Sequence, residues 1–182
     1  MLAMTRTEQP APPPGNLEGI FRRHHSLVYA TAFRVTGSSQ DAEDVLQTIF
    51  LRLLRRQSEL DLSPNPGSYL RRAAVNAGLD LLRARGRSGA LPNDDFDQLP
   101  SARGESDPGR RQQDRETRRH LRQAILALSP RNAEIFSMRF LEGIPNREIA
   151  ETLGMSQTAV GVALHRARNQ VKQELGSLLG GH

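Results

Sequence analysis

The stretch IAETLGMSQTAVGVALHRAR, residues 149–168, predicts two helices joined by a tight turn. Gly154 can adopt the left-handed conformation that ends a helix, and Met155 can fill the gap between the two helices. Ser156 is a good N-cap, because its hydroxyl can accept a backbone N–H two or three residues further on. Apolar residues then recur at helical spacing and predict one buried stripe: Val160, Leu164, Ala167, Val171 and Leu175. A short helix, a glycine turn and a longer helix are typical of a helix-turn-helix, which places its second helix in the DNA major groove.

Length and composition limit what can surround this stretch. The chain has 182 residues, no Cys, no Trp and 4% aromatic residues, so it has room for one or two small domains with aliphatic cores. The lack of Cys excludes disulfides and thiolate zinc sites and fits a reducing compartment. No apolar run approaches the roughly 20 residues of a membrane span, and no signal-peptide pattern opens the chain. We therefore expect a soluble, cytoplasmic protein without membrane insertion.

The net charge of +5 is unevenly distributed. Residues 1–87 carry twelve Arg against eight acidic residues, and residues 117–182 carry nine basic against five acidic residues. Between them, residues 88–116 carry four Arg against seven acidic residues. Two basic blocks therefore flank an acidic segment, and basic blocks are compatible with nucleic-acid binding without proving it.

The N-terminal half predicts three helices after a proline-rich, disordered tail at residues 1–16. Their ranges are 17–36, 40–56 and 66–85, each with an apolar stripe, and Gly37 and Gly86 follow the first and third. His24 and His25 are not a metal site, because adjacent helical residues point about 100° apart. These helices form a domain at residues 17–87.

Two polar features of this half have both a structural and a functional interpretation. Asp41, Glu43 and Asp44 in the first turn of the second helix suit the helix dipole, so composition alone favours solvent-exposed surface. A polar line along the third helix, with Tyr69 at its start, is either solvent-facing or suited to a nucleic-acid backbone with stacked bases: Arg72, Asn76, Asp80 and Arg83. Asp80 is expected to orient Arg72 or Arg83 rather than to touch DNA.

Residues 88–116 predict a flexible linker, because Gly, Pro and acidic residues are scattered without a hydrophobic period. Its negative charge can keep the linker off DNA or can mimic DNA in a protein channel. Residues 117–182 then predict a four-helix domain that ends in the helix-turn-helix. Its first two helices are expected at 114–128 and 130–141, the second capped by Ser129. The expected fold class is all-α, with two small helical domains.

Three motifs occur in an order that identifies a family. The first is DAEDVLQTIFL at 41–51, the second YLRRAAVNAGLDLLR at 69–83, and the third LSPRNAEIFSMRFLEG at 128–143 followed by the opening stretch. They resemble the polymerase-binding helix, the minus-ten promoter segment and the fourth conserved region of bacterial sigma factors of the extracytoplasmic-function (ECF) group. The resemblance covers about residues 17–87 and 117–176.

The resemblance implies a protein that recruits core RNA polymerase to a promoter and opens the duplex, without catalysis, metal or cofactor of its own. By matching positions, it implies polymerase contacts from Asp41, Asp44, Gln47 and Phe50. It also implies that one set of residues holds the separated minus-ten strand: Asn65, Ser68, Tyr69, Arg72, Asn76 and Arg83. The chemistry agrees, because an unpaired base can stack on Tyr69 for about 1–3 kcal/mol and Arg side chains can bind its phosphates.

The helix expected in the major groove departs from the family pattern. Gly161, Val162 and Ala163 stand where relatives often carry Lys, Ser and Arg, and Val162 can touch a thymine methyl but cannot pair with guanine. The minus-thirty-five contacts are therefore expected from Gln157, Thr158, Val162 and His165, with phosphates bound by Arg147, Arg166 and Arg168. Pro145 also replaces the usual cap of the preceding helix, although Asn146 could serve.

These departures leave an alternative open. A regulator of the same architecture would bind polymerase or DNA without initiating transcription. An enzyme is disfavoured, because the chain has no Ser/His/Asp order, phosphate loop or HExxH. The partners implied by the resemblance are core RNA polymerase, promoter DNA and an anti-sigma factor.

Overall fold

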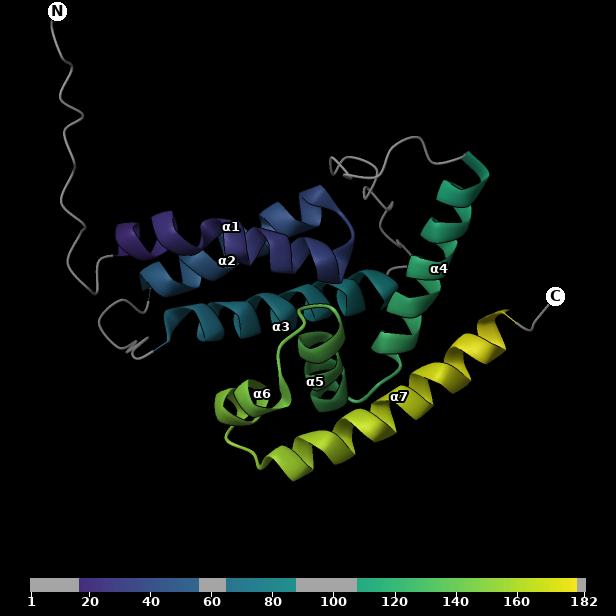
Figure 1. The fold of residues 1–182 in the computed structure, drawn as a ribbon. Helices are drawn as coiled ribbons and strands as arrows, with labels where there is room; N and C mark the ends of the chain where they lie inside the picture. The colour runs from purple at the N-terminus through teal and green to yellow at the C-terminus, as the bar shows by residue number, and fades with distance from the viewer. Residues whose placement is uncertain (1–16, 56–64, 88–107, 180–182) are drawn as a thin grey trace, which may run out of the picture.

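The structure of the protein, a computed structural model, describes residues 17–55, 65–87 and 108–179 (Figure 1). Every regular element in these ranges is an α-helix, which confirms the predicted all-α class. The helices are α1 (Leu17–Thr36), α2 (Ser39–Arg55), α3 (Pro66–Arg87), α4 (Pro108–Leu126), α5 (Pro130–Phe140), α6 (Asn146–Leu153) and α7 (Gln157–Leu179). The predicted tail at 1–16 and residues 88–107 of the predicted linker lie outside the described residues. No helix within the described ranges has the length and apolarity needed to cross a membrane.

α1, α2 and α3 pack on one another as the first helical unit. Gly37 ends α1 with a φ of +76°, a conformation that favours glycine, and its N–H donates to the Phe33 carbonyl at 2.8 Å. The Ser38 hydroxyl then accepts the Asp41 N–H at 3.3 Å and caps α2. The core of this unit is aliphatic, as the composition requires, and includes Val28, Ala32, Ile49, Leu53 and Leu70.

Gly78 lies where α3 crosses α1, and its lack of a side chain lets the two helices approach closely. A Cβ at this position would lie 2.9 Å from Cγ1 of Val35. Val35 is β-branched and only 1% exposed, so it cannot move aside without disturbing its neighbours. We expect Gly78→Ala to cost about 1–3 kcal/mol through overpacking, of which improved helix propensity offsets at most about 1 kcal/mol.

Urea unfolding of Gly78→Ala and Gly161→Ala tests this expectation. Gly161 is also helical, but a Cβ there would meet no atom within 4 Å beyond its chain neighbours and the backbone of its own helix. Gly161→Ala is therefore expected to stabilise the protein by up to about 1 kcal/mol, opposite in sign to Gly78→Ala. Two shifts of the same sign and size would show that the α1–α3 crossing does not require glycine.

α4 to α7 form the second helical unit, and its turns follow the predicted capping pattern. The Ser129 hydroxyl accepts the Asn132 N–H at 3.4 Å at the start of α5. Gly154 ends α6 with a φ of +62°, and the Ser156 hydroxyl caps α7 by accepting the Ala159 N–H at 3.1 Å. Met155 packs against the core between the two helices. The predicted helix-turn-helix is therefore confirmed as a structure.

Two expectations for this unit are wrong. α4 begins at Pro108, so residues 108–116 of the predicted linker are helical. The first turns of α4 are polar and have no apolar stripe. They have side-chain hydrogen bonds along the helix instead, such as that from Gln112 Nε2 to Glu116 Oε1 at 2.9 Å. Asn146 does not cap α6. Pro145 occupies the cap position without a side-chain hydrogen bond, because Asn146 is already the first helical residue.

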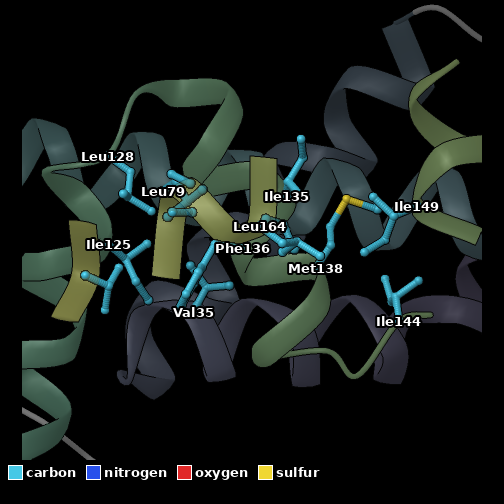
Figure 2. Packing of buried hydrophobic residues seen from close by; sticks show 14 of the residues in the cluster. Val35, Leu79, Ile125, Leu128, Ile135, Phe136, Met138, Ile144, Ile149 and Leu164 are labelled. Carbon is cyan, nitrogen blue, oxygen red and sulfur yellow. The ribbon is translucent and has the colours of Figure 1, made fainter. Parts of the chain in front are cut away.

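The hydrophobic core of the second unit extends into the first. Val35 of α1 and Val75, Leu79 and Leu82 of α3 belong to the same buried cluster as side chains of α4, α5 and α7. Figure 2 shows Val35 and Leu79 beside residues such as Phe136. In Figure 1, α3 (teal) accordingly lies between α1 and α2 on one side and α5 and α6 (green) on the other. Neither the helix pattern nor the charge pattern of the sequence indicates this contact.

Candidate nucleic-acid and polymerase interfaces

The first two residues of the polar line of α3, Arg72 and Asn76, face α5 of the second unit. Arg72 Nε donates to Glu134 Oε1 at 2.7 Å, and Asn76 Nδ2 donates to the same oxygen at 2.9 Å. Arg131, one turn before Glu134 on α5, donates from Nη1 to Glu134 Oε2 at 2.9 Å. Arg72 Nη1 also donates to the carbonyl of Thr152 at 3.4 Å. Two side chains predicted to hold promoter DNA therefore bind one carboxylate of the neighbouring unit.

Glu134 is only 5% exposed, so its charge requires compensation within the protein. Burial by itself raises the pKa of the Glu134 carboxyl, but it is outweighed by hydrogen bonds from Asn76 and Arg72, the charge of Arg72 and a hydrogen bond from Arg131. Together they hold the pKa of Glu134 below its usual range. The carboxylate is consequently ionised near neutral pH and binds Arg72 as an anion.

Two further glutamates of the second unit contact the first unit. Glu142, in the turn after α5, accepts from Thr31 Oγ1 at 2.7 Å and from Arg34 Nε and Nη2 at 2.7 and 2.9 Å. Glu148 on α6 accepts from Ser68 Oγ at 3.1 Å. We call these three glutamates, with the α1 and α3 side chains that contact them, the interdomain network. Arg71 joins it, with Nη1 3.8 Å from Glu148 Oε1 and Nε 4.0 Å from Glu142 Oε2.

The other predicted minus-ten residues lie outside the interdomain network. Asn65 Oδ1 accepts the Ser68 N–H at 3.1 Å, so Asn65 caps α3. Tyr69 is 42% exposed, which leaves its ring accessible to a stacked base. Arg83 donates to Asp80 at 3.2 Å, as expected for an acid that orients an arginine. The residues predicted to hold the minus-ten strand therefore fall into two groups: side chains that contact glutamates of the second unit, and side chains that lie outside that contact.

The exposed face of α7 carries the residues predicted to meet DNA. Gln157, Thr158, Val162, His165 and Arg166 are all exposed, and Val162 is 46% exposed. This position confirms that an apolar side chain occupies the centre of that face.

The two remaining arginines predicted for this interface have contacts within the second unit. The Arg168 guanidinium lies 5.9 Å from the centre of the Phe140 ring, a cation–π distance. Both residues line a cavity of about 520 Å³ between α5 and α7. Arg147 on α6 pairs with Glu151 at 2.9 Å on the exposed surface, and such exposed pairs exchange partners at little cost.

The predicted polymerase-binding residues lie on α2, on the side of the molecule away from α5. Asp44 and Gln47 are exposed, and Phe50 is mostly buried against Phe21, with ring centres 4.8 Å apart. Asp41 differs, because its side chain is completely buried in an ion pair with Arg85 of α3. In this structure Asp41 positions α2 on α3 and presents no surface to a partner.

An open apolar groove of about 600 Å³ accompanies these residues, a feature not predicted from the sequence. It is lined by Leu17, Glu18, Phe21, Gln47, Phe50, Leu51 and Leu54. Phe21, Leu51 and Leu54 are 43%, 51% and 55% exposed, which is unusual for three large apolar side chains in one place. α2 has more apolar residues than its core face needs, because Leu53 fills the core while Leu51 and Leu54 face outward. This excess is the sequence signal that could have revealed the groove.

The lowered pKa of Glu134 predicts a pH-dependent stability. A carboxylate whose native pKa lies below its unfolded value contributes stability that is fully present above the unfolded pKa and is lost as the pH falls through the native pKa. The usual value is 4.5, so the loss begins as the pH falls through that value and continues below it. We expect the difference in unfolding free energy between the wild type and Glu134→Gln to be largest near neutral pH and to shrink below pH 4.5.

Urea unfolding at a series of pH values measures this difference, and taking the difference cancels the titration of the other carboxylates. The charged groups that face Glu134 are Arg72 and Arg131, which stay protonated throughout the range. A difference that stays constant with pH would show that the Glu134 charge does not stabilise the structure.

Comparisons with known proteins identify the two helical units. Sigma-70 region 2 matches residues 20–88, and Sigma-70, region 4 matches residues 118–171. These matches correspond to α1–α3 and to most of α4–α7. They also place the interdomain network between the two regions. Among the residues that the structure describes, no three His, Cys, Asp or Glu side chains form a group that could hold a metal ion.

Several bacterial sigma factors are similar along most of the chain. The RNA polymerase sigma-E factor of Streptomyces antibioticus is 31% identical over 158 residues, which cover 87% of this chain and 83% of the relative. RNA polymerase sigma factor CarQ of Myxococcus xanthus is 29% identical, with 88% and 90% covered. The ECF RNA polymerase sigma factor SigE of Mycolicibacterium smegmatis is 32% identical over 86% of this chain, which spans only 60% of that relative.

A solved structure agrees with the fold. Sigma factor RpoE from Bartonella quintana, solved in complex with the anti-sigma factor NepR, aligns with a TM-score of 0.53 at 18% identity, over 87% of this chain and 95% of that one. At this identity the likeness concerns the arrangement of helices alone. The two sigma-70 regions and the relatives matched along most of their length together show that the chain belongs to the ECF group of the sigma-70 family.

Proposed function

We propose that the chain binds core RNA polymerase and directs it to promoters, with α3 contacting the minus-ten element and α7 contacting the minus-thirty-five element. The observation that carries this proposal is the presence of both sigma regions on one chain, each with a helix whose polar side chains suit DNA. Sigma factors are not enzymes, so the polymerase supplies the chemistry and this chain supplies binding and strand separation. Such a role implies a cytoplasmic location.

The proposed minus-ten contacts follow from the side chains along α3 and its N-terminus. Tyr69 is half-exposed and can stack on an unpaired base, which stabilises the separated strand by about 1–3 kcal/mol. Arg72 and Arg83 can bind phosphates, while Asn65, Ser68 and Asn76 can donate to base edges or phosphate oxygens. Arginine suits this role because its planar guanidinium donates two parallel hydrogen bonds to an anion.

The proposed minus-thirty-five contacts are weighted toward the start of α7. Gln157 and Thr158 are polar, exposed and close to the helix N-terminus, where a recognition helix meets base edges. Val162 contributes an apolar contact that suits a thymine methyl. His165 and Arg166, with Arg147 and Arg168, supply polar and charged groups for the backbone. This composition predicts weaker base discrimination than a helix with Arg at its centre.

The proposed partners are core RNA polymerase and an anti-sigma factor. The groove beside Gln47 and Phe50, together with the exposed Asp44, is the proposed polymerase surface, and Asp41 supports it through its ion pair with Arg85. The complex of RpoE with an anti-sigma factor, together with the family, supports an anti-sigma partner for this chain. The exposed apolar side chains of that groove also give an anti-sigma factor a surface on which to pack.

In vitro transcription tests the proposal. The purified chain is added to core polymerase and fragmented genomic DNA, and transcripts are sequenced. We expect new transcripts whose start sites share two upstream elements about two DNA turns apart, as contacts near minus ten and minus thirty-five imply. Polymerase binding without any promoter-dependent transcript would favour the alternative, a regulator that does not initiate. That alternative is motivated by the weak DNA face around Val162.

A further inference from the structure

The proposed minus-ten face of α3 is occupied in this structure by the second helical unit, α4 to α7, which we call the second domain; α1 to α3 form the first domain. Arg72 and Asn76 would bind DNA, yet both donate to Glu134 at 2.7 and 2.9 Å. A carboxylate and a phosphate attract the same charge-assisted hydrogen bonds from a guanidinium. The Nε–H of Arg72 points at one acceptor at a time, so Glu134 and a DNA phosphate compete for it.

We propose that the interdomain network is autoinhibitory: Glu134, Glu142 and Glu148 hold the second domain over the minus-ten face of the free protein, while the polymerase-binding groove stays accessible. Because this inference depends on the proposed minus-ten role of α3, its test must distinguish failure of the autoinhibition from failure of that proposed role. In this scheme the chain can dock on polymerase in the closed form. It binds the promoter strand only after the second domain has moved away.

Steric exclusion adds to the competition for Arg72. Val75 and Leu79, on the same side of α3 as Arg72 and Asn76, are 0% and 2% exposed and belong to the apolar cluster shared with the second domain. A DNA strand and the second domain therefore cannot occupy this face together. Ser68 is also engaged, since its hydroxyl donates to Glu148.

The composition of the contact makes it reversible. The Arg72 and Arg34 side chains are 38% and 43% exposed, so water reaches the guanidinium side of both ion pairs, while the Glu134 and Glu142 carboxylates are 6% and 1% exposed. A polyanion such as DNA can therefore approach the arginines and compete for their hydrogen bonds. The apolar part of the contact from the first domain is limited to the few residues that join the shared cluster, Val35, Val75, Leu79 and Leu82.

The proposed polymerase surface lies away from this contact. Phe21, Leu51 and Leu54 remain 43% to 55% exposed in the closed form. In Figure 1, α5 and α6 lie on the opposite side of α3 from α2, which carries most of the groove. Closure therefore blocks the proposed DNA face and leaves the proposed polymerase face unchanged.

The test compares Glu134→Gln and Arg34→Gln with a matched control, Glu116→Gln. Glu134→Gln removes the central charge, and Arg34→Gln removes the two hydrogen bonds that Arg34 donates to Glu142 without touching any proposed DNA contact. Glu116 lies on the exposed side of α4 and accepts from Gln112 of the same helix, so Glu116→Gln changes the net charge as Glu134→Gln does. Circular dichroism checks that each variant folds, and the exposed Arg34 provides a second opening variant if Glu134→Gln does not.

Three measurements are made on the full chain. Domain separation is followed by energy transfer between dyes on Ser26→Cys and Gln173→Cys, which are exposed positions in a chain without native Cys. DNA affinity is measured by the anisotropy of a fluorescein-labelled, mixed-sequence single strand, the form of DNA that the proposed minus-ten face would bind. Polymerase affinity is measured with immobilised core enzyme.

We expect Glu134→Gln and Arg34→Gln to reduce energy transfer and to tighten DNA binding about tenfold, as when a tenth of the free protein is open. Arg34→Gln removes a positive charge, which alone would weaken DNA binding, so tighter binding can only reflect opening. Glu116→Gln should change neither quantity by more than about twofold, and polymerase affinity should stay the same in all variants.

Unchanged energy transfer in both variants would overturn the inference, because the network would not hold the domains together. Reduced energy transfer with unchanged DNA affinity would also overturn it, because closure would not hide a DNA-binding face. Wild-type transcription from genomic templates separates these failures from failure of the proposed function. A chain that transcribes but fails either test is a sigma factor without this autoinhibition.

Discussion

Leu51→Asp is expected to reduce the affinity for core RNA polymerase by at least about 100-fold. Leu51 is 51% exposed in the groove on α2, and burying a leucine against a partner contributes about 1.5–3 kcal/mol. The aspartate loses that contribution and must also lose water from a charged group, which costs more. Equilibrium binding to immobilised core polymerase measures the change.

Leu178→Asp is the matched control for this substitution. Leu178 is a half-exposed leucine near the end of α7, 38% exposed and remote from the groove, so the same chemical change should leave polymerase affinity within about twofold. Both side chains are already in contact with water, so neither variant should unfold the protein. Equal affinities for the two variants would show that the groove is not the polymerase surface.

The predicted helices agree with the structure where local chemistry sets their ends. Gly37 and Gly154 end helices through positive φ, and Ser156 begins one through its hydroxyl, so a few neighbouring residues suffice to place each boundary. α4 is the exception, because its first turns have polar contacts instead of an apolar stripe. A hydrophobic period cannot detect a helix that buries little.

The interdomain network was not predictable in the same way. Glu142 and Thr31 are 111 residues apart in the sequence, and Glu134 and Asn76 are 58 residues apart. A glutamate on a helix is normally solvent-exposed, so its burial becomes visible only when its partners are placed in space. In the structure α5 buries six consecutive residues, 133–138, although Glu134 and Ser137 among them are polar, so its sequence gives no sign that the helix is buried on every side. A helix buried all round needs a neighbour on each side, and that neighbour is α3.

Arg72→Ala is expected to reduce the formation of heparin-resistant open complexes by about 10- to 100-fold, while polymerase affinity stays the same. The loss corresponds to about 1.5–3 kcal/mol for hydrogen bonds to a charged group. Arg119→Ala controls for the lost charge, because Arg119 is exposed on α4 and has no proposed DNA contact. Equal losses of open complexes and of polymerase binding would contradict the assignment of Arg72 to the promoter.

The same residue provides a stricter test, because Arg72 acts in both states of the protein. In the closed form it holds Glu134, and in the open form it would hold DNA, so Arg72→Ala weakens both. In the wild-type background, Arg72→Ala also opens the closed form, and this opening partly compensates for the lost DNA contact. In a Glu134→Gln background the protein is already open, so no such compensation occurs. Arg72→Ala should therefore cost more DNA affinity in Glu134→Gln than in the wild type, with a coupling of about 0.5–3 kcal/mol. Equal costs in the two backgrounds would mean that Arg72 does not hold the closed form, and a cost near zero in Glu134→Gln would mean that Arg72 does not bind DNA.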